Sequence, residues 1–384
     1  MAAPWSTITK DVGVTDSWGT APTRALSTAF VPPAVPSSLS VPPLPLFAAI
    51  ARMQALRTTS PAIIAALLRA ATALTEAVFD DATADLDLLS DVEMIEQTAR
   101  TALAGSLGAG VCDLCMVAMG YTWHDHASRL VVTKRPLADF VYDGGAATGH
   151  GVVLAEAKGS FAKTVDATSV RRSCEAAYAR QAGDYVGQST AAGTIVHGYA
   201  IKAGCQLTSV RTPPPPYAFL HVTQTPPTAH GVPSANVGTA STAIALGNYR
   251  AAFMLAGASA VVQSIDALRG DRQRELVPQL FDVISTPRGQ FLTGSSAAPR
   301  SWEYRDMQIP GHRFGIRLDV AASFLNELSR MLAGPAPVPK TLQLPVVPTP
   351  NGFENDYVFP DGFSLLPFTS PSGSRLWSAI GGMT

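Results

Sequence analysis

The run VVLAEAK, from Val152 to Lys158, constrains the fold of this chain more than any other stretch. Its apolar, valine-rich beginning favours a buried strand, yet the run then places an acid and a lysine two residues apart. Because side chains alternate along a strand, Glu156 and Lys158 share one face of the sheet. A carboxylate among such apolar neighbours is costly unless a cation compensates its charge. We therefore expect a charged site built into a sheet.

Composition fits a folded chain with no general attraction to polyanions. Of 384 residues, 47% are apolar and 15% charged, which is typical of a core-forming protein. The net charge is -1, so any electrostatic argument for nucleic acid or membrane must be local. Only six of the 28 basic residues are lysines, a bias that we attribute to genome composition.

Four cysteines and the N-terminal segment indicate a reducing compartment. Cys112 and Cys115 form a single CxxC without a second pair, which favours buried free thiols over a zinc site. The N-terminus lacks a signal-peptide pattern, and residues 30–50 contain six prolines, which a membrane-spanning helix would not carry. We expect a soluble, cytoplasmic protein of bacterial or phage origin, with no membrane partner.

Periodicity and turn residues predict three regions. Residues 1–59 are expected to form a proline-rich arm, 60–285 an α/β core with preceding helices, and 286–384 a proline-rich C-terminal region. Helices are expected at 61–79, 88–106, 168–190, 240–268 and 319–333, and strands at 128–136, 137–143, 152–160, 194–201 and 217–225, with glycine-rich and proline-rich turns at 143–151 and 213–216.

A second acid completes the candidate site. Asp139 lies seventeen residues before Glu156, and a hairpin that turns in the glycine-rich segment brings the two acids side by side. Two carboxylates on adjacent strands suit Mg²⁺ or Mn²⁺, and a lysine beside them can orient an attacking water. The backbone carbonyl of Ala157 is a further candidate ligand.

Asp139, Glu156, Ala157 and Lys158 together resemble the pattern of the PD-(D/E)XK nuclease superfamily, although Ala138 stands where the family name has proline. The predicted order of helices and strands over residues 88–225 is also similar to the common core of that superfamily. The resemblance implies a restriction-endonuclease-like fold, a mixed sheet flanked by helices, and Mg²⁺-dependent hydrolysis of DNA.

Two further features extend the resemblance. Gln181 and Tyr185 have the QxxxY spacing of the RecB-like branch, where these residues help to hold the site and the DNA strand. An acid on the helix that precedes the strands commonly completes the metal shell in this superfamily. That implies Glu96 as a third metal ligand, with Glu93 as the alternative.

Each of these residues also has a simpler interpretation. Glu156 and Lys158 can be an ordinary ion pair at a strand end before a glycine turn, and Gln181 and Tyr185 can be plain helix surface. The stretch WHDHAS, from Trp123 to Ser128, is more typical of a polar loop than of a metal site. His197 and His221 fit satisfied histidines in strands.

Two other functions stay open at this point. The fold can be a catalytically degenerate nuclease core that binds nucleic acid, with the apolar segment 240–268 as the interface of a homo-oligomer. Alternatively, the proline-rich arms can lace neighbouring subunits of a phage or virus component. Convergence of Asp139, Glu156 and Lys158 favours the nuclease over both.

Overall fold

A computed structural model describes most of the chain in two compact units. The first unit comprises residues 1–53 and 70–236, and the second comprises residues 54–69 and 237–384. The described residues are 5, 8–24, 30–57, 60–79, 81, 84–131, 133, 135–144, 151–163, 165–207, 218–227, 238–270, 277–295, 311–334, 337–348 and 357–383. The tip of the expected glycine-rich turn and the proline run 213–216 lie outside them.

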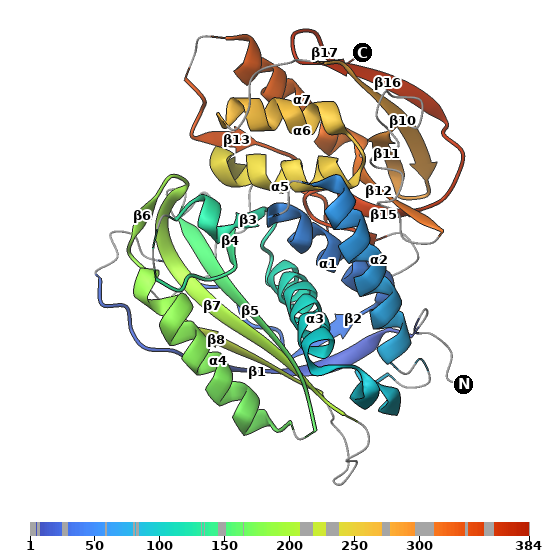
Figure 1. Cartoon of the computed structure of the whole chain (residues 1–384). Helices are drawn as coiled ribbons and strands as arrows, with labels where there is room; N and C mark the ends of the chain where they lie inside the picture. The colour runs from blue at the N-terminus through green and yellow to red at the C-terminus, as the bar shows by residue number, and fades with distance from the viewer. Residues whose placement is uncertain are drawn as a thin grey trace. The chain divides into compact units, whose positions relative to one another are not determined.

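The first unit is built on a mixed sheet whose described strands follow the order β2-β1-β8-β7-β5-β4-β3, with β6 paired to β7 (Figure 1). Strand β5 runs antiparallel to β4 and parallel to β7, and β3 runs antiparallel to β4. The strands are β1 (Lys10–Trp18), β2 (Ser38–Val41), β3 (His124–His126), β4 (Phe140–Asp143), β5 (Val152–Ala162), β6 (Ser189–Thr190), β7 (Gly193–Gln206) and β8 (Ala218–Gln224).

Helices cover both faces of this sheet (Figure 1). A Cβ atom on Gly159 of β5 would meet the Ala104 carbonyl of α3, whereas one on Gly204 of β7 would meet Val170 of α4. The two helices therefore pack on opposite faces. The helical segments are α1 (Pro43–Arg57), α2 (Pro61–Val78), η1 (Ser90–Met94), α3 (Gln97–Ala118), η2 (Ala127–Arg129), α4 (Ala167–Gln181) and η4 (Gly183–Tyr185), and the division between units falls within α1 and α2.

The N-terminal region differs from the expected arm. Its strand β1 pairs in parallel with β8 and antiparallel with β2, so it extends the main sheet rather than standing apart. The residues KDVGVTDSW of β1 alternate only weakly between apolar and polar, and the side chains of Lys10 and Val12 are buried. Sheet pairing, not a strong hydrophobic pattern, gives β1 its structure, and the expected arm also contains the apolar helix α1.

The second unit contains an antiparallel sheet in the order β14-β15-β12-β11-β10-β16-β17 and a separate β9-β13 pair, within its described residues. It also contains the helices α5, α6 and α7. Their bounds are β9 (Thr239–Ser241), α5 (Thr242–Leu255), α6 (Ser259–Leu268), β10 (Gln279–Thr286), β11 (Gly289–Gly294), β12 (His312–Arg317), α7 (Leu318–Ala333), β13 (Thr341–Gln343), β14 (Tyr357–Val358), β15 (Phe363–Pro367), β16 (Gly373–Ser378) and β17 (Gly382–Met383).

The core of the second unit explains why the expected boundary at 285 does not coincide with a structural division. Tyr249 of α5 stacks on Phe324 of α7 with ring centroids 4.3 Å apart, and Phe253 contacts both Phe281 and Phe324. Residues on both sides of 285 therefore share one hydrophobic core. The proline content of the C-terminal region hides this, because its strands are short and lie between proline-containing segments.

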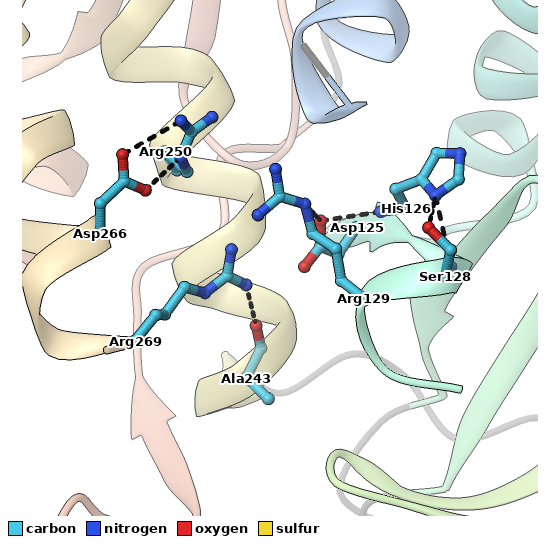
Figure 2. A network of polar contacts seen from close by, with 8 residues as sticks. All are labelled: Asp125, His126, Ser128, Arg129, Ala243, Arg250, Asp266 and Arg269. Carbon is cyan, nitrogen blue, oxygen red and sulfur yellow. Dashed lines mark hydrogen bonds and ion pairs between the residues drawn. The ribbon is translucent and has the colours of Figure 1, made fainter. Parts of the chain in front are cut away.

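Helices α5 and α6 replace the single helix expected over 240–268. The break falls at Gly257, whose φ of 80° is the left-handed conformation that ends a helix. A buried ion pair then holds the two helices together, because Arg250 donates to both carboxylate oxygens of Asp266 (Figure 2). Arg269, the C-cap residue of α6, adds a hydrogen bond to the Ala243 carbonyl of α5, 3.0 Å long.

Helix α3 begins later and ends later than the expected 88–106. Residues 90–94 form a short 3-10 helix, and the α-helix runs from Gln97 to Ala118, through Cys112 and Cys115. The C-terminal half of α3 is buried on nearly all sides. Its sequence therefore lacks the alternation of apolar and polar faces by which a surface helix is recognised. By length and composition α3 is also long and apolar enough to cross a membrane. However, 67% of its apolar 18-residue stretch is buried inside the protein, as in a core helix, so its composition is weak evidence for a membrane span.

Candidate metal and nuclease site

Asp139 and Glu156 lie side by side, as the hairpin argument predicts. Strands β4 and β5 pair with Phe140 opposite Ala155, so one further step places Asp139 opposite Glu156. Directly opposed residues on antiparallel strands point to the same face. The Ala157 backbone N–H also donates to Asp139 Oδ2 at 3.2 Å, which fixes the Asp139 carboxylate against the strand that carries Glu156.

The Glu156 carboxylate is buried with few hydrogen-bond donors. The side chain is 0% exposed, and neither of its oxygens accepts a hydrogen bond of ordinary geometry from the described residues. Its charge partner is the Lys158 ammonium, which forms an ion pair with Oε1. The pKa of Glu156 is raised to about 7, chiefly by burial and further by repulsion from Asp139, while Lys158 offsets part of the rise.

Lys158 is the solvent-facing member of this group. Its side chain is 39% exposed, whereas Glu156 is fully buried. The strand does not end after Lys158, as the simpler interpretation assumed, because β5 continues to Ala162. Gly159 serves helix packing instead of a turn, since a Cβ atom there would overlap the Ala104 carbonyl of α3. The close approach of α3 holds this part of β5 in place.

Gln181 and Tyr185 hold the segment that leads into Asp139. The Gln181 side chain donates from Nε2 to the Leu137 carbonyl at 3.2 Å, and the Gln181 backbone carbonyl accepts from the Ala138 N–H at 2.8 Å. Tyr185 donates its hydroxyl to the Pro136 carbonyl at 2.9 Å. Helix α4 ends at Gln181, so Tyr185 lies on the short η4 and not on the same helix as expected. These two residues therefore position Asp139 through its preceding backbone.

Glu96 lies elsewhere and has another role. It is the N-cap of α3, and its exposed carboxylate accepts hydrogen bonds from the backbone N–H groups of Thr98 and Ala99. These bonds hold the pKa of Glu96 below its ordinary value. The structure does not bring this carboxylate to the Asp139–Glu156 pair. The alternative, Glu93, lies in the short helix η1.

Within the stretch WHDHAS, residues His124–His126 form the strand β3 and the next residues enter η2, in place of the expected polar loop. His124 contacts Arg52, whose Nη2 lies 2.8 Å from His124 Nδ1, and it stacks on Tyr142. Asp125 accepts the His126 backbone N–H and lies 3.9 Å from the Arg129 guanidinium, as Figure 2 shows. The partner of His124, Arg52, is distant in sequence, so the local pattern suggested a loop. The expected strand at 128–136 includes positions outside the described residues, and its first two described residues belong to η2.

Two residues near the site escaped the sequence argument. The Cys112 thiol of α3 is buried, and its pKa is raised mainly by burial, with contributions from Asp139 and Glu156. All four cysteines are free and buried, as expected for Cys112 and Cys115. Lys202 of β7 is the register partner of Lys158. Its signal in the sequence is a lone lysine within an apolar strand, in a chain that has only six lysines.

The described part of the chain contains no group of three or more His, Cys, Asp or Glu side chains able to hold a metal ion. Asp139 and Glu156 are a pair of carboxylates, and Mg²⁺ is commonly bound through one or two carboxylates while it retains several waters. The Glu156 oxygens are buried and short of hydrogen-bond donors, and the Lys158 ammonium offsets only part of the rise that burial and Asp139 cause in the pKa of Glu156. The donor set and its electrostatics therefore fit a hard divalent cation.

Comparisons with known proteins do not identify this chain, because no family model, no curated protein and no solved structure matches it.

Proposed function

We propose that this chain is a metal-dependent nuclease that hydrolyses DNA phosphodiester bonds at Asp139, Glu156 and Lys158. The observation that carries the proposal is the register that sets Asp139 opposite Glu156, with the Lys158 ammonium on the same carboxylate. Two acids and a lysine converge there from two strands, and one of the acids is buried without enough donors.

The topology around the site supports the proposal. Helix α3 is followed by the antiparallel strands β3, β4 and β5, then by α4, then by β7 parallel to β5. This order is similar to the common core of the PD-(D/E)XK superfamily, and the acids and the lysine occupy the second and third strands of that core. Exposed arginines on α4, among them Arg172 and Arg180, add local positive charge for a phosphate backbone.

In the proposed reaction each residue of the site has its own role. Asp139 and Glu156 would hold Mg²⁺ or Mn²⁺ together with a backbone carbonyl near Ala157. When bound, the cation supplies Lewis-acid stabilisation of the phosphate charge and lowers the pKa of water. Lys158 is exposed enough to reach the substrate, so its ammonium orients the attacking water and donates to a phosphate oxygen as charge develops. Gln181 and Tyr185 keep Asp139 in position through the backbone at 136–138.

A cleavage assay with matched lysine variants tests this function. Wild type, Lys158→Ala and Lys163→Ala are incubated with labelled single- and double-stranded DNA in Mg²⁺, Mn²⁺ or EDTA. Lys163 is an exposed lysine just beyond the end of β5 and serves as the control. We expect metal-dependent cleavage by wild type and Lys163→Ala, and a loss of roughly 100-fold or more in Lys158→Ala.

A thermal melt gives a second measurement that does not depend on the substrate. Mg²⁺ or Mn²⁺ should raise the melting temperature of the wild type because the cation binds only the folded site. Glu156→Gln should lose that increase. Absence of cleavage by a folded wild type, or cleavage by Lys158→Ala at the wild-type rate, would contradict the proposed function and favour a binding or structural role.

A further inference from the structure

Lys202 lies beside the proposed catalytic lysine. Strands β5 and β7 run parallel with Lys158 paired to Lys202, and neighbouring strands are about 5 Å apart. On β7, Gly204 faces Val170 of α4 and lies near the Ser160 hydroxyl of β5. By alternation, Lys158 and Lys202 are then on the α4 side of the sheet too. Two ammonium groups thus project from adjacent strands on one face.

The two lysines differ in their partners. Lys158 pairs with Glu156 two residues earlier on its own strand. The position of β7 that corresponds to Glu156 is Ala200, which offers no carboxylate. Lys202 makes no ion pair and no side-chain hydrogen bond with the described residues. Its charge is therefore not compensated within that part of the chain.

The electrostatics of Lys202 point the same way. Its pKa is lowered, chiefly by partial burial and further by repulsion from Lys158, with the Cys174 thiolate form acting in the opposite direction. Across the sheet its next partner in register is His221, which is buried and held by Thr15 and Ser17 of β1. Lys202 is only partly buried and, unlike Lys158, has no carboxylate beside it on its own strand, so its ammonium is available to an external anion.

We propose that Lys202 binds a phosphate of the nucleic-acid strand next to the phosphate that reacts, and so positions the strand across β5 and β7. The proposal rests on the proposed nuclease function. The ion pair with Glu156 draws Lys158 toward the two acids, whereas nothing draws Lys202 in that direction. The two ammonium groups therefore contact different phosphates, and repulsion between them favours that separation.

Such a contact acts on binding and carries no sequence information. A lysine on a phosphate that does not react stabilises the ground state and the transition state equally, so its loss raises KM and leaves kcat nearly unchanged. A lysine–phosphate contact also releases a counterion from the nucleic acid. Its loss therefore makes the slope of the logarithm of affinity against the logarithm of salt concentration shallower by about 0.7–0.9. A buried lysine stem with only a packing role would change neither quantity.

The test measures DNA binding by wild type, Lys202→Met, Lys202→Arg and Lys163→Ala over a range of NaCl concentrations in EDTA. Methionine retains the apolar stem and so protects the fold, which circular dichroism checks. We expect Lys202→Met to weaken binding of a labelled oligonucleotide about tenfold at low salt and to reduce the slope by nearly one. Lys202→Arg should restore both, and Lys163→Ala should match the wild type. In Mg²⁺, Lys202→Met should raise KM with kcat within about threefold of wild type.

The outcomes separate this inference from the function on which it rests. Wild-type affinity and salt slope in Lys202→Met overturn the phosphate contact, even if the wild type cleaves DNA. A fall in kcat without a change in binding also overturns it, because Lys202 would then act on the chemical step. A wild type that binds but never cleaves in any metal contradicts the nuclease, while the salt slope still decides whether Lys202 contacts phosphate. A wild type that does not bind DNA overturns both.

Discussion

A buried carboxylate with a basic partner is found in each unit of this protein, Glu156 in the first and Asp266 in the second, and these two pairs are built differently. In the second unit, Arg250 donates to both oxygens of Asp266, and both side chains are at least 94% buried. In the first unit, Glu156 meets only the Lys158 ammonium, which is 39% exposed, and a second acid, Asp139, stands opposite.

The difference separates a structural pair from a candidate active site. A planar guanidinium satisfies a carboxylate on both oxygens and fixes the packing of α5 on α6. A single ammonium beside two acids offsets only part of the effect of burial and of repulsion from Asp139, which raise the pKa of Glu156 to about 7. Perturbed groups of this kind cluster at functional sites. The comparison makes opposite predictions for removing the acid in each unit.

The largest expected effect is in the second unit. Asp266→Ala leaves the Arg250 guanidinium buried without its partner, and we expect a loss of about 3–5 kcal/mol in the free energy of unfolding. Chemical denaturation measures this loss, and the transition that shifts identifies the unfolding of the second unit. The double variant Arg250→Met/Asp266→Leu should recover most of the loss. A loss below about 1 kcal/mol in Asp266→Ala would show that the pair is not structural.

The sequence indicated the Glu156 site better than the Asp266 pair, for a physical reason. Glu156 and Lys158 interrupt a strand whose other residues are apolar, so a short window exposes the conflict between charge and burial. Asp266 lies on α6 and meets Arg250 sixteen residues earlier on α5, and only the break at Gly257 brings them together. A sequence window cannot show such a pairing without the fold.

The fold itself was predictable to a similar degree. Strong alternation and turn residues revealed β4, β5, β7 and β8, and the glycine at 334 ended α7 as expected. The strand β3 was missed because its polar residues find buried partners such as Arg52. The assignment of Glu96 rested on the resemblance, which implies an acid on the helix before the strands, and Glu96 stands at the start of α3. That position fits a metal ligand and an N-cap equally well, and the hydrogen bonds of Glu96 are those of an N-cap.

The next prediction concerns removal of the Glu156 carboxylate. At neutral pH this change should raise the free energy of unfolding, whereas removal of the Asp266 carboxylate lowers it. The Glu156 pKa of about 7 in the folded state lies above the ordinary 4.5, so its contribution to stability is fully present below about pH 4.5 and is lost as pH rises through 7. Glu156→Gln does not titrate. We expect the variant to become more stable than wild type across this window, by about 1–3 kcal/mol at pH 8 without metal. Denaturation at several pH values from 4 to 8 measures the difference.

Glu96→Gln is the matched control because its carboxylate has the reverse perturbation. Hydrogen bonds to the helix N-terminus lower its pKa, so its contribution is present above the ordinary pKa and is lost as pH falls. Glu96→Gln should therefore be less stable than wild type at pH 8, and it should cleave DNA at the wild-type rate. If the difference in the free energy of unfolding between wild type and Glu156→Gln did not change from pH 4 to 8, the Glu156 carboxylate would not be perturbed. The electrostatic difference between the Glu156 pair and the Asp266 pair would then be disproved.

The smallest effect tests whether the acids of the first unit are held in place for a function. Tyr185→Phe removes the hydrogen bond to the Pro136 carbonyl and should cost about 1 kcal/mol of stability. Because that bond fixes the backbone that leads into Asp139, we expect cleavage to fall several-fold, a loss that Mn²⁺ should not restore. Tyr178→Phe is the control, since its hydroxyl is also buried and bonded, but to Thr225 and the Thr20 carbonyl. If Tyr185→Phe and Tyr178→Phe lose the same stability but only Tyr185→Phe loses cleavage, Tyr185 positions Asp139. If the two variants lose the same stability and the same cleavage, Tyr185 is a packing residue.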